Sequence, residues 1–500
     1  MIANWNRIGA LGVGVVCCLG MGAAAGGQTP TPVGERFIVN THTAGEQEEP
    51  DIAIGSHGDF LVVWTDLTGL DGSESGVFAR MFANDASPLG DQFQVNTYAA
   101  SGQAEPAVAA NREGDFVVVW ATGKPKEFTG VVLGEVMGQM FANDGTRLGG
   151  EFPISEPSAA LKNTPCVDIS ESGEVVVAWT ESVGNEAAIV ARRLASDGTS
   201  LGAPFRVSTR ALNTYAECSV AVDEDGDFVV AWDEPARVVS RAFLRTYSSE
   251  GEEVSQEVEL GTSHLDNVYP NVDMESDGNF VMAWLNRDDL SLSIRVSAQK
   301  FADDGRPLTD EFALGDLAGD RSRPAIALDD DGNAVIVWNN NREGGGIFGQ
   351  RVAANGTLRG DVFTVSADPD RFDQIPAVAS STNGNFVVAW RQFDRQRSSE
   401  RFDIVGHRFA VDESIDDTPR ISYWWGKVNQ HTEDGIWKTD PDGRSGANLD
   451  KLAYCRKWYP ETARVEPYEV ETITDWKRAG NRGSYTRTSM SDRCVPPERP

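Results

Sequence analysis

A tryptophan recurs seven times in this chain, each time at the end of a strongly apolar run, at intervals of 52 to 59 residues. A glycine stands six residues before every one of these tryptophans. A proline stands fourteen residues before six of them, and Cys218 takes that place in the fourth repeat. Fixed offsets of this kind indicate one structural unit copied seven times. The seven positions are Trp64, Trp120, Trp179, Trp232, Trp284, Trp338 and Trp390.

Each unit has the pattern of four short strands. The first strand follows the proline, the second is the apolar run that ends at the tryptophan, and the glycine between them suits a tight hairpin turn. Because the second strand is apolar at consecutive positions, we expect both of its faces to be buried. Four-stranded units at this period are typical of propeller blades. The sequence therefore predicts an all-β fold, a seven-bladed β-propeller over residues 33–411.

The two ends of the array predict how the ring closes. The seventh unit has a third strand at residues 404–409 but no fourth, whereas a strand of the missing type, VGERFIVN at 33–40, precedes the first proline. We expect this N-terminal strand to complete the last blade, which removes the open edges of the array. An open solenoid is the alternative, but it requires capping units, which the sequence does not show.

Length variation among the units falls almost entirely in the loop between the second and third strands. In a four-stranded meander this loop emerges on the same face as the loops between blades, here named the variable-loop face. The two turns of constant length emerge on the other face, here named the constant-turn face. Because loops vary while a scaffold holds them, we expect a binding surface on the variable-loop face.

The N-terminus indicates export. Residues 1–25 contain Arg7, a short apolar run and then small residues, which is the pattern of a secretory signal peptide. A membrane anchor is the alternative, but the run is short and rich in glycine, and no other stretch is apolar enough to span a bilayer. The protein is therefore expected to be secreted, periplasmic or at the cell surface.

Four cysteines follow the signal segment, and an even number in an exported protein favours disulfides. Cys166 lies one residue after the proline position of the third unit, and Cys218 occupies that position in the fourth. Adjacent strand positions point to opposite faces, so we predict that these two cysteines pair across one blade interface. Two separate buried thiols are the alternative. Cys455 and Cys494 are expected to form a second disulfide.

The formal charge of −32 is carried almost entirely by residues 26–411. Such a surface repels nucleic acid and anionic lipid. It also offers many carboxylates to divalent cations, although a solvated acidic surface is the simpler interpretation. Asp223, Asp225 and Asp227 resemble a calcium loop slightly, but a polar hairpin turn is favoured there.

Composition changes sharply after Thr418. Residues 412–419 are an acidic linker, and residues 420–500 form a small module rich in aromatic residues. Its tryptophans are candidates for a sugar-stacking platform, with a simple packing role as the alternative. The candidate binding residues are Trp424, Trp425, Trp437 and Trp458.

The same module holds the main candidate metal site. Asp440 and Asp442 precede Gly443, and Asp450 follows, so that oxygen ligands alternate around a glycine turn as in calcium loops. The final glutamate of an EF-hand is missing, and a plain turn is the alternative. Calcium is the only cofactor that the sequence suggests.

No catalytic motif emerges. The five histidines share no metal spacing, and no nucleophile elbow, phosphate-binding loop or sialidase Asp box is present. One polar residue recurs near the end of every third strand, which indicates a structural hydrogen bond and not an active site. These residues are Arg80, Gln139, Arg192, Arg245, Gln299, Gln350 and His407.

The repeat resembles those of uncharacterised bacterial exported proteins with VVVW, GQRF and DGxxLGxEF segments, here over residues 33–411. That resemblance implies a propeller but no activity. We therefore expect a secreted, non-catalytic protein that binds an extracellular ligand, glycan or protein through the variable-loop face. The alternative is a glycan-acting hydrolase of propeller fold, which requires two close carboxylates in a cleft on that face.

Overall fold

The computed structural model describes residues 29–411, except residues 56, 100, 124–133, 159, 185, 213–215, 237–238, 262–265, 289–292, 316–321, 341–344, 369 and 395–400. It also describes the backbone of residues 464–478 and 481–495. Every regular element in these segments is a β-strand. No helix that could cross a membrane occurs in them.

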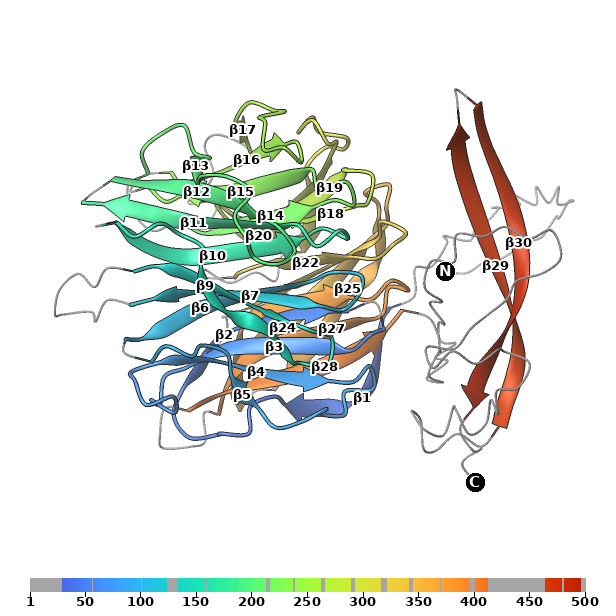
Figure 1. Ribbon diagram of the computed structural model, residues 1–500, viewed down its shortest axis with the longest axis horizontal. Coiled ribbons are helices and arrows are strands. Elements are labelled where there is room, and N and C mark those ends of the chain that lie inside the picture. Colours follow the sequence, from blue (N-terminus) through green and yellow to red (C-terminus); the bar gives the residue numbers. More distant parts are fainter. Residues whose placement is uncertain are drawn as a thin grey trace, which may run out of the picture. The chain divides into compact units, whose positions relative to one another are not determined.

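Seven antiparallel four-stranded sheets form the blades (Figure 1). The first two blades are β2 (Gln47–Ile54), β3 (Phe60–Asp66), β4 (Gly76–Phe82) and β5 (Phe93–Gln94), then β6 (Gln103–Ala110), β7 (Phe116–Thr122), β8 (Val136–Phe141) and β9 (Arg147–Pro153). The third and fourth are β10 (Leu161–Ile169), β11 (Val175–Val183), β12 (Glu186–Leu194) and β13 (Phe205–Arg206), then β14 (Cys218–Val222), β15 (Phe228–Glu234), β16 (Arg241–Tyr247) and β17 (Val258–Glu259).

The remaining three blades repeat the pattern. The fifth and sixth are β18 (Asp266–Met274), β19 (Phe280–Asp288), β20 (Ser293–Phe301) and β21 (Phe312–Gly315), then β22 (Ala325–Leu328), β23 (Ala334–Asn339), β24 (Gly346–Val352) and β25 (Leu358–Ala367). The seventh contains β26 (Arg371–Ser380), β27 (Phe386–Asp394), β28 (Phe402–Ala410) and the N-terminal strand β1 (Thr31–Ile38). The predicted number of blades is confirmed.

The N-terminal strand closes the ring as predicted. β1 pairs antiparallel with β28, with Val33 opposite Arg408 and Ile38 opposite Val405. Figure 1 shows β1, at the blue end of the propeller, beside β28 at its orange end. The strand begins two residues earlier than the sequence pattern indicated. Because β1 covers the edge of β28, the last blade has the same four strands as the others.

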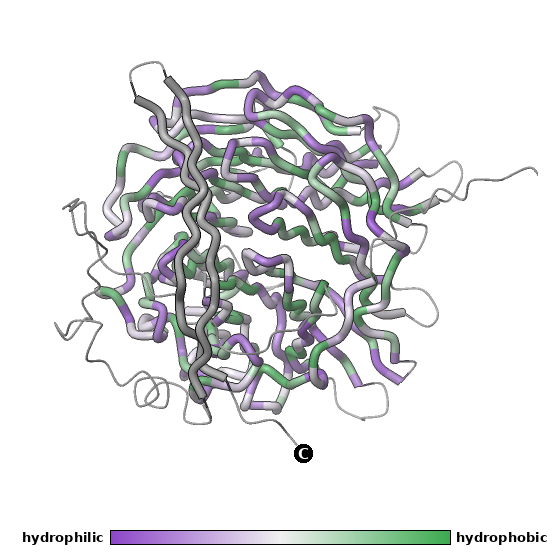
Figure 2. Tube along the Cα trace, turned by 90° about the vertical axis from the view of Figure 1, so that its right-hand side faces the viewer, coloured by the Kyte–Doolittle hydropathy of each residue, from purple (hydrophilic) through white to green (hydrophobic). Residues whose placement is uncertain are grey.

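Apolar side chains fill the space between each pair of neighbouring blades. The described residues form seven buried clusters, one for each of the seven interfaces. Strand β3 is buried at every position, and its residues alternate: Trp64 packs towards blade seven and Val63 towards blade two. Figure 2 shows these hydrophobic strand segments inside the ring, with hydrophilic residues around them. The apolar runs are therefore buried on both faces, as the sequence indicated.

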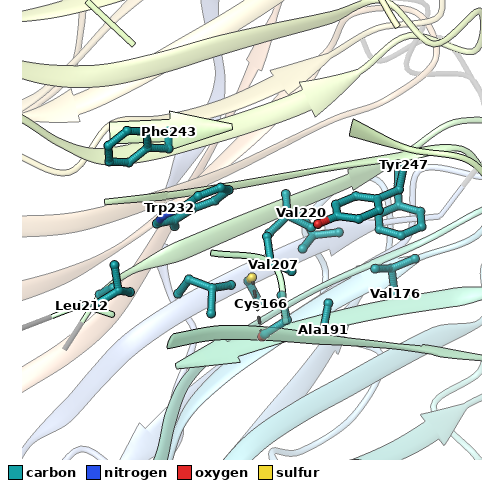
Figure 3. Close-up of a cluster of buried hydrophobic side chains, with 14 of the residues drawn as sticks. Cys166, Val176, Ala191, Val207, Leu212, Val220, Trp232, Phe243 and Tyr247 are labelled. Atoms are coloured by element: carbon teal, nitrogen blue, oxygen red, sulfur yellow. Dashed lines mark hydrogen bonds between the residues drawn. The ribbon is translucent and has the colours of Figure 1, made fainter. Parts of the chain in front are cut away.

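The interface between blades three and four carries the predicted disulfide. Cys166 and Cys218 are bonded, with their Cα atoms 6.0 Å apart. Figure 3 shows Cys166 among apolar side chains from both blades, with Trp232 and Tyr247 on the blade-four side. The bond joins the inner strands β10 and β14, so it fixes two blades to each other next to the centre of the ring.

The recurring polar residue of the third strand has the structural role that its repetition indicated. Arg80 Nε donates to the carbonyl of Gly90 at 3.0 Å, and Gln299 Nε2 donates to the carbonyl of Thr309 at 2.8 Å. Arg245 differs, because it pairs with Glu253 at 2.9 Å. These bonds attach the third strand of a blade to the loop before its fourth strand, where strand pairing is short.

The C-terminal segment is a separate unit, residues 414–500. Its described backbone is one hairpin of β29 (Arg464–Arg478) and β30 (Asn481–Val495). Cys494 lies on β30, but its predicted partner Cys455 lies outside the described residues. The same holds for the candidate binding and calcium residues Trp424, Trp425, Trp437, Trp458, Asp440, Asp442 and Asp450, so these assignments stay predictions.

Candidate functional site at the channel mouth

The first strands of all seven blades surround a central cavity of about 400 Å³. Each of these strands starts at the variable-loop face, because the loop between blades leads into it. The residue just before the proline position therefore lies at the mouth of the channel on that face. We name these seven residues the inner ring: Glu49, Glu105, Thr164, Glu217, Tyr269, Arg323 and Ile375.

The inner ring has an unusual backbone. Five of its residues have a positive φ between 48° and 57°, the left-handed region that side chains other than glycine rarely adopt. At these positions the pairing between the first and second strands slips, as between Glu48 and Asp51 in blade one. A bulge of this kind redirects the side chain. Because the bulge recurs in five blades, we attribute it to the scaffold. The side chain at the bulge, however, differs from blade to blade.

Side chains of the inner ring connect the first four blades. The amide of Glu105 and the hydroxyl of Thr65 both donate to Glu49 Oε2 at 3.0 Å. The amide of Thr164 donates to Glu105 Oε2 at 2.7 Å, and its hydroxyl donates to the carbonyl of Ala216 at 2.8 Å. The positions of these carboxylates are therefore fixed by bonds from the neighbouring blade.

Arg323 extends across the mouth to a blade that is not its neighbour. It projects from blade six, its guanidinium lies 5.2 Å from the ring centroid of Tyr269 in blade five, and its Nη2 reaches Glu217 Oε1 in blade four at 2.5 Å. The side chains of Arg323 and Glu217 remain 42% and 28% exposed. A ligand at the mouth is therefore able to touch both charges.

Asp233, which follows Trp232 on β15, lies beside Glu217 and bonds to the backbone of this group. Its carboxylate accepts bonds from the amide of Glu217 at 2.8 Å and from the amide of Tyr269 at 3.3 Å. Burial raises the pKa of Asp233 to about 7, and the nearby charge of Glu217 acts in the same direction. Burial also raises the pKa of Glu217, against the opposing effect of Arg323. The mouth thus contains carboxyl groups with perturbed proton affinity, which is typical of functional sites.

Three further aspartates line the channel below the mouth. Burial raises the pKa of Asp51 and of Asp273 to about 6. Burial raises the pKa of Asp168 to about 7, and the charge of Asp273 adds to that shift. Each carboxylate accepts a bond from the next blade, as Asp168 does from the amide of Val222 at 2.8 Å. These bonds hold the carboxylates in a poorly solvated channel.

We expect the protein to have a higher melting temperature at pH 5 than at pH 8. The pKa values of Asp51, Asp168 and Asp273 lie above the ordinary value of 3.8, so the folded state binds more protons than the unfolded chain between about pH 4 and pH 7. Their contribution to stability is complete below pH 4 and is lost as the pH rises through 6 to 7. Calorimetry at the two pH values measures the difference.

Asp168→Asn provides the control for this pH effect. The substitution is expected to raise the melting temperature at pH 8 and to change it little at pH 5, because the amide carries no charge and still accepts a hydrogen bond. An equal or higher melting temperature at pH 8 than at pH 5 in the parent protein contradicts the assignment.

The opposite end of the channel, on the constant-turn face, also carries an arginine. Arg112 lies 2.7 Å from Glu171 and 3.9 Å from Asp330. The turn at Asp223 is a polar hairpin turn, as favoured from the sequence, since its Oδ1 accepts the amides of Asp225 and Asp227. Within the part of the chain that the structure describes, no group of three His, Cys, Asp or Glu side chains could hold a metal ion.

The sequence predicts a binding surface on the variable-loop face, and this prediction stays a prediction. Its candidate residues lie in the C-terminal module, and it does not indicate the inner ring. Aligning the seven units on their prolines could have found it, because the preceding position changes in charge and size from unit to unit while the proline recurs.

Comparisons with known proteins give a fold and no activity. No family model and no curated protein matches the sequence.

A protein of unknown function from Dyadobacter fermentans has a similar structure, with a TM-score of 0.50 and 10% identity over 77% of this chain and 99% of that chain. The Hadza microbial sialidase Hz136 has a TM-score of 0.41 and 11% identity over 67% and 73% of the two chains. The polysaccharide lyase Uly1 has a TM-score of 0.43 and 8% identity over 71% and 88%. At such identities the likeness is one of fold alone, and the chain is an all-β seven-bladed propeller similar in structure to a bacterial protein of unknown function.

Proposed function

We propose that this chain is a secreted, non-catalytic binding protein that holds an extracellular ligand at the channel mouth on its variable-loop face. The observation that carries the proposal is the inner ring. Its left-handed backbone geometry recurs in five blades, but the five side chains there are two carboxylates, a hydroxyl, a phenol and an alkyl group. At positions that serve the scaffold of a propeller, the same residue type recurs from blade to blade. A position where the backbone geometry recurs but the residue type differs suits the binding of a specific ligand.

The charge of the mouth favours neutral or cationic ligands. Among its described residues, the acidic side chains of Glu49, Glu105 and Glu217 outnumber the guanidinium of Arg323, which is itself paired with Glu217. An anionic ligand meets net repulsion here. The signal segment and the disulfide between Cys166 and Cys218 support an extracellular setting.

The test is a binding screen of the purified full-length mature protein on arrays of neutral, amino and anionic oligosaccharides and of extracellular-matrix proteins, followed by titration calorimetry. We expect binding to a neutral or cationic probe, with about tenfold weaker affinity for Tyr269→Ala and for Glu217→Gln, which corresponds to about 1.4 kcal/mol. Leu89→Ser is the control, because Leu89 is 54% exposed in a turn of the constant-turn face. No binding to any probe, or undiminished binding by both mouth variants, contradicts the proposal.

A glycan-acting hydrolase is the second candidate, and the neighbouring carboxyl groups of Glu217 and Asp233 favour it. A carboxyl group with a pKa near 7 is protonated often enough at neutral pH to act as a general acid. This candidate predicts hydrolysis of an aryl glycoside that Asp233→Asn abolishes. Binding without turnover across a panel of aryl glycosides supports the binding protein instead.

A further inference from the structure

Three phenylalanines form a row across blade seven at the variable-loop face. Phe372 on β26 pairs with Phe393 on β27, and Phe393 pairs with Phe402 on β28. Directly paired residues of an antiparallel sheet point to the same side. The rings of Phe393 and Phe402 lie 5.2 Å apart between centroids, and all three side chains are half-buried. We name these residues the phenylalanine row.

The scaffold does not require this row. The position of Phe393, three residues after the tryptophan, holds Leu67, Gly123, Ser182, Pro235, Arg287 and Asn341 in the other units. The position of Phe372, four residues before the proline position, holds Glu46, Gly102, Leu161, Thr214, Asp266 and Asp320. At these two positions, the seventh unit alone has aromatic residues. The backbone of Phe402 bonds to Gly45 of blade one at 3.3 Å, but six equivalent blades fold without aromatic groups at the positions of Phe372 and Phe393, so a ligand is a reason for these rings.

Polar groups connect the phenylalanine row to the mouth. Arg391 points to the same side as Phe393, two residues away on β27, and its guanidinium lies 4.3 Å from the ring centroid of Phe402. Arg391 also donates to Glu48 Oε1 at 2.6 Å and to Gln374 Oε1 at 2.5 Å. Glu48 and Gln374 each lie next to an inner-ring residue, Glu49 and Ile375. Hydrogen-bonding side chains thus lead from the mouth to an aromatic surface.

We propose that the ligand of the mouth is a neutral polysaccharide chain, and that the phenylalanine row is the platform on which one of its sugar rings stacks. This inference rests on the proposed function and names its ligand. The C–H face of a sugar ring packs on aromatic rings, while its hydroxyl groups need donors and acceptors at the rim. Phe372 and Phe393 offer the rings, Phe402 packs beside Phe393 under the Arg391 guanidinium, and Arg391 and Gln374 offer the polar rim. A neutral chain also fits the excess of carboxylates at the mouth.

Titration calorimetry with sugar chains of increasing length tests this inference. The probes are cello- and manno-oligosaccharides from dimer to hexamer, and polygalacturonate is the anionic comparison. We expect the full-length protein to bind a neutral hexamer more tightly than the dimer. Phe393→Ala and Phe402→Ala should weaken hexamer binding about tenfold, or about 1.4 kcal/mol, and leave dimer binding unchanged. Phe393→Tyr should retain binding, because it preserves the ring.

Phe312→Ala is the matched control for lost stability. Phe312 is also a half-buried phenylalanine of the propeller, but it lies on β21 of blade five. The Phe312→Ala variant should bind the neutral hexamer and the dimer as the parent protein does. If the parent binds the hexamer and both alanine variants bind it equally well, the platform is wrong while the mouth stands. If the parent binds only a protein or an anionic chain, the ligand class is wrong. If the parent binds no probe in any screen, the proposed function itself fails.

Discussion

A chain that begins at residue 41 is expected to lose the propeller fold, whereas a chain that begins at residue 29 keeps it. The difference between the two is β1, whose removal leaves β28 with an unpaired edge in the last blade. The shorter chain also lacks Val39, which is fully buried, and Phe37, whose ring lies 5.1 Å from that of Phe82 in blade one. β1 thus contributes to the interface that closes the ring.

Circular dichroism and thermal unfolding measure this effect. We expect the shorter chain to aggregate or to unfold without a cooperative transition, and a synthetic peptide of residues 29–40 to restore the transition by strand addition. Phe37→Ala should lower the free energy of unfolding by about 3 kcal/mol. Ile38→Ser, at a position that is 51% exposed, should change it little. A cooperative transition at the parent temperature in the shorter chain contradicts the closure.

Reduction of the disulfide between Cys166 and Cys218 is expected to lower the free energy of unfolding by about 4 kcal/mol. The bond closes a loop with a sequence separation of 52 residues, and loop-closure entropy in the unfolded chain gives a value of this size. The effect should be large because the bond joins the inner strands of two blades that belong to separate sheets and share no strand pairing.

Urea unfolding with and without a reductant measures this contribution. The double substitution Cys166→Ser and Cys218→Ser should reproduce the reduced protein, and reductant should then have no further effect on the propeller transition. If reductant leaves the unfolding midpoint of the parent unchanged, the disulfide contributes nothing to stability. A reductant effect that persists in the double variant assigns it to other cysteines.

Local repetition was enough to predict the architecture. The tryptophan, glycine and proline offsets predicted seven blades of four strands, because strand periodicity and turn residues act over a few positions. The strand absent after residues 404–409 and present at 33–40 predicted the closure. Register also predicted the disulfide, since Cys166 and Cys218 occupy adjacent positions of equivalent strands.

The composition of the site depended on the tertiary structure. Arg323 and Glu217 are 106 positions apart and belong to blades that are not neighbours, so only the closed ring brings them to 2.5 Å. The left-handed backbone of residues such as Glu49 and Tyr269 sets where their side chains lie, and a strand pattern does not reveal it. The sequence by itself therefore determined the blades and their order, because these follow from short-range periodicity. Only the closed ring determined which side chains meet at its centre, because their positions depend on the twist of all seven sheets and on the bulges in their first strands.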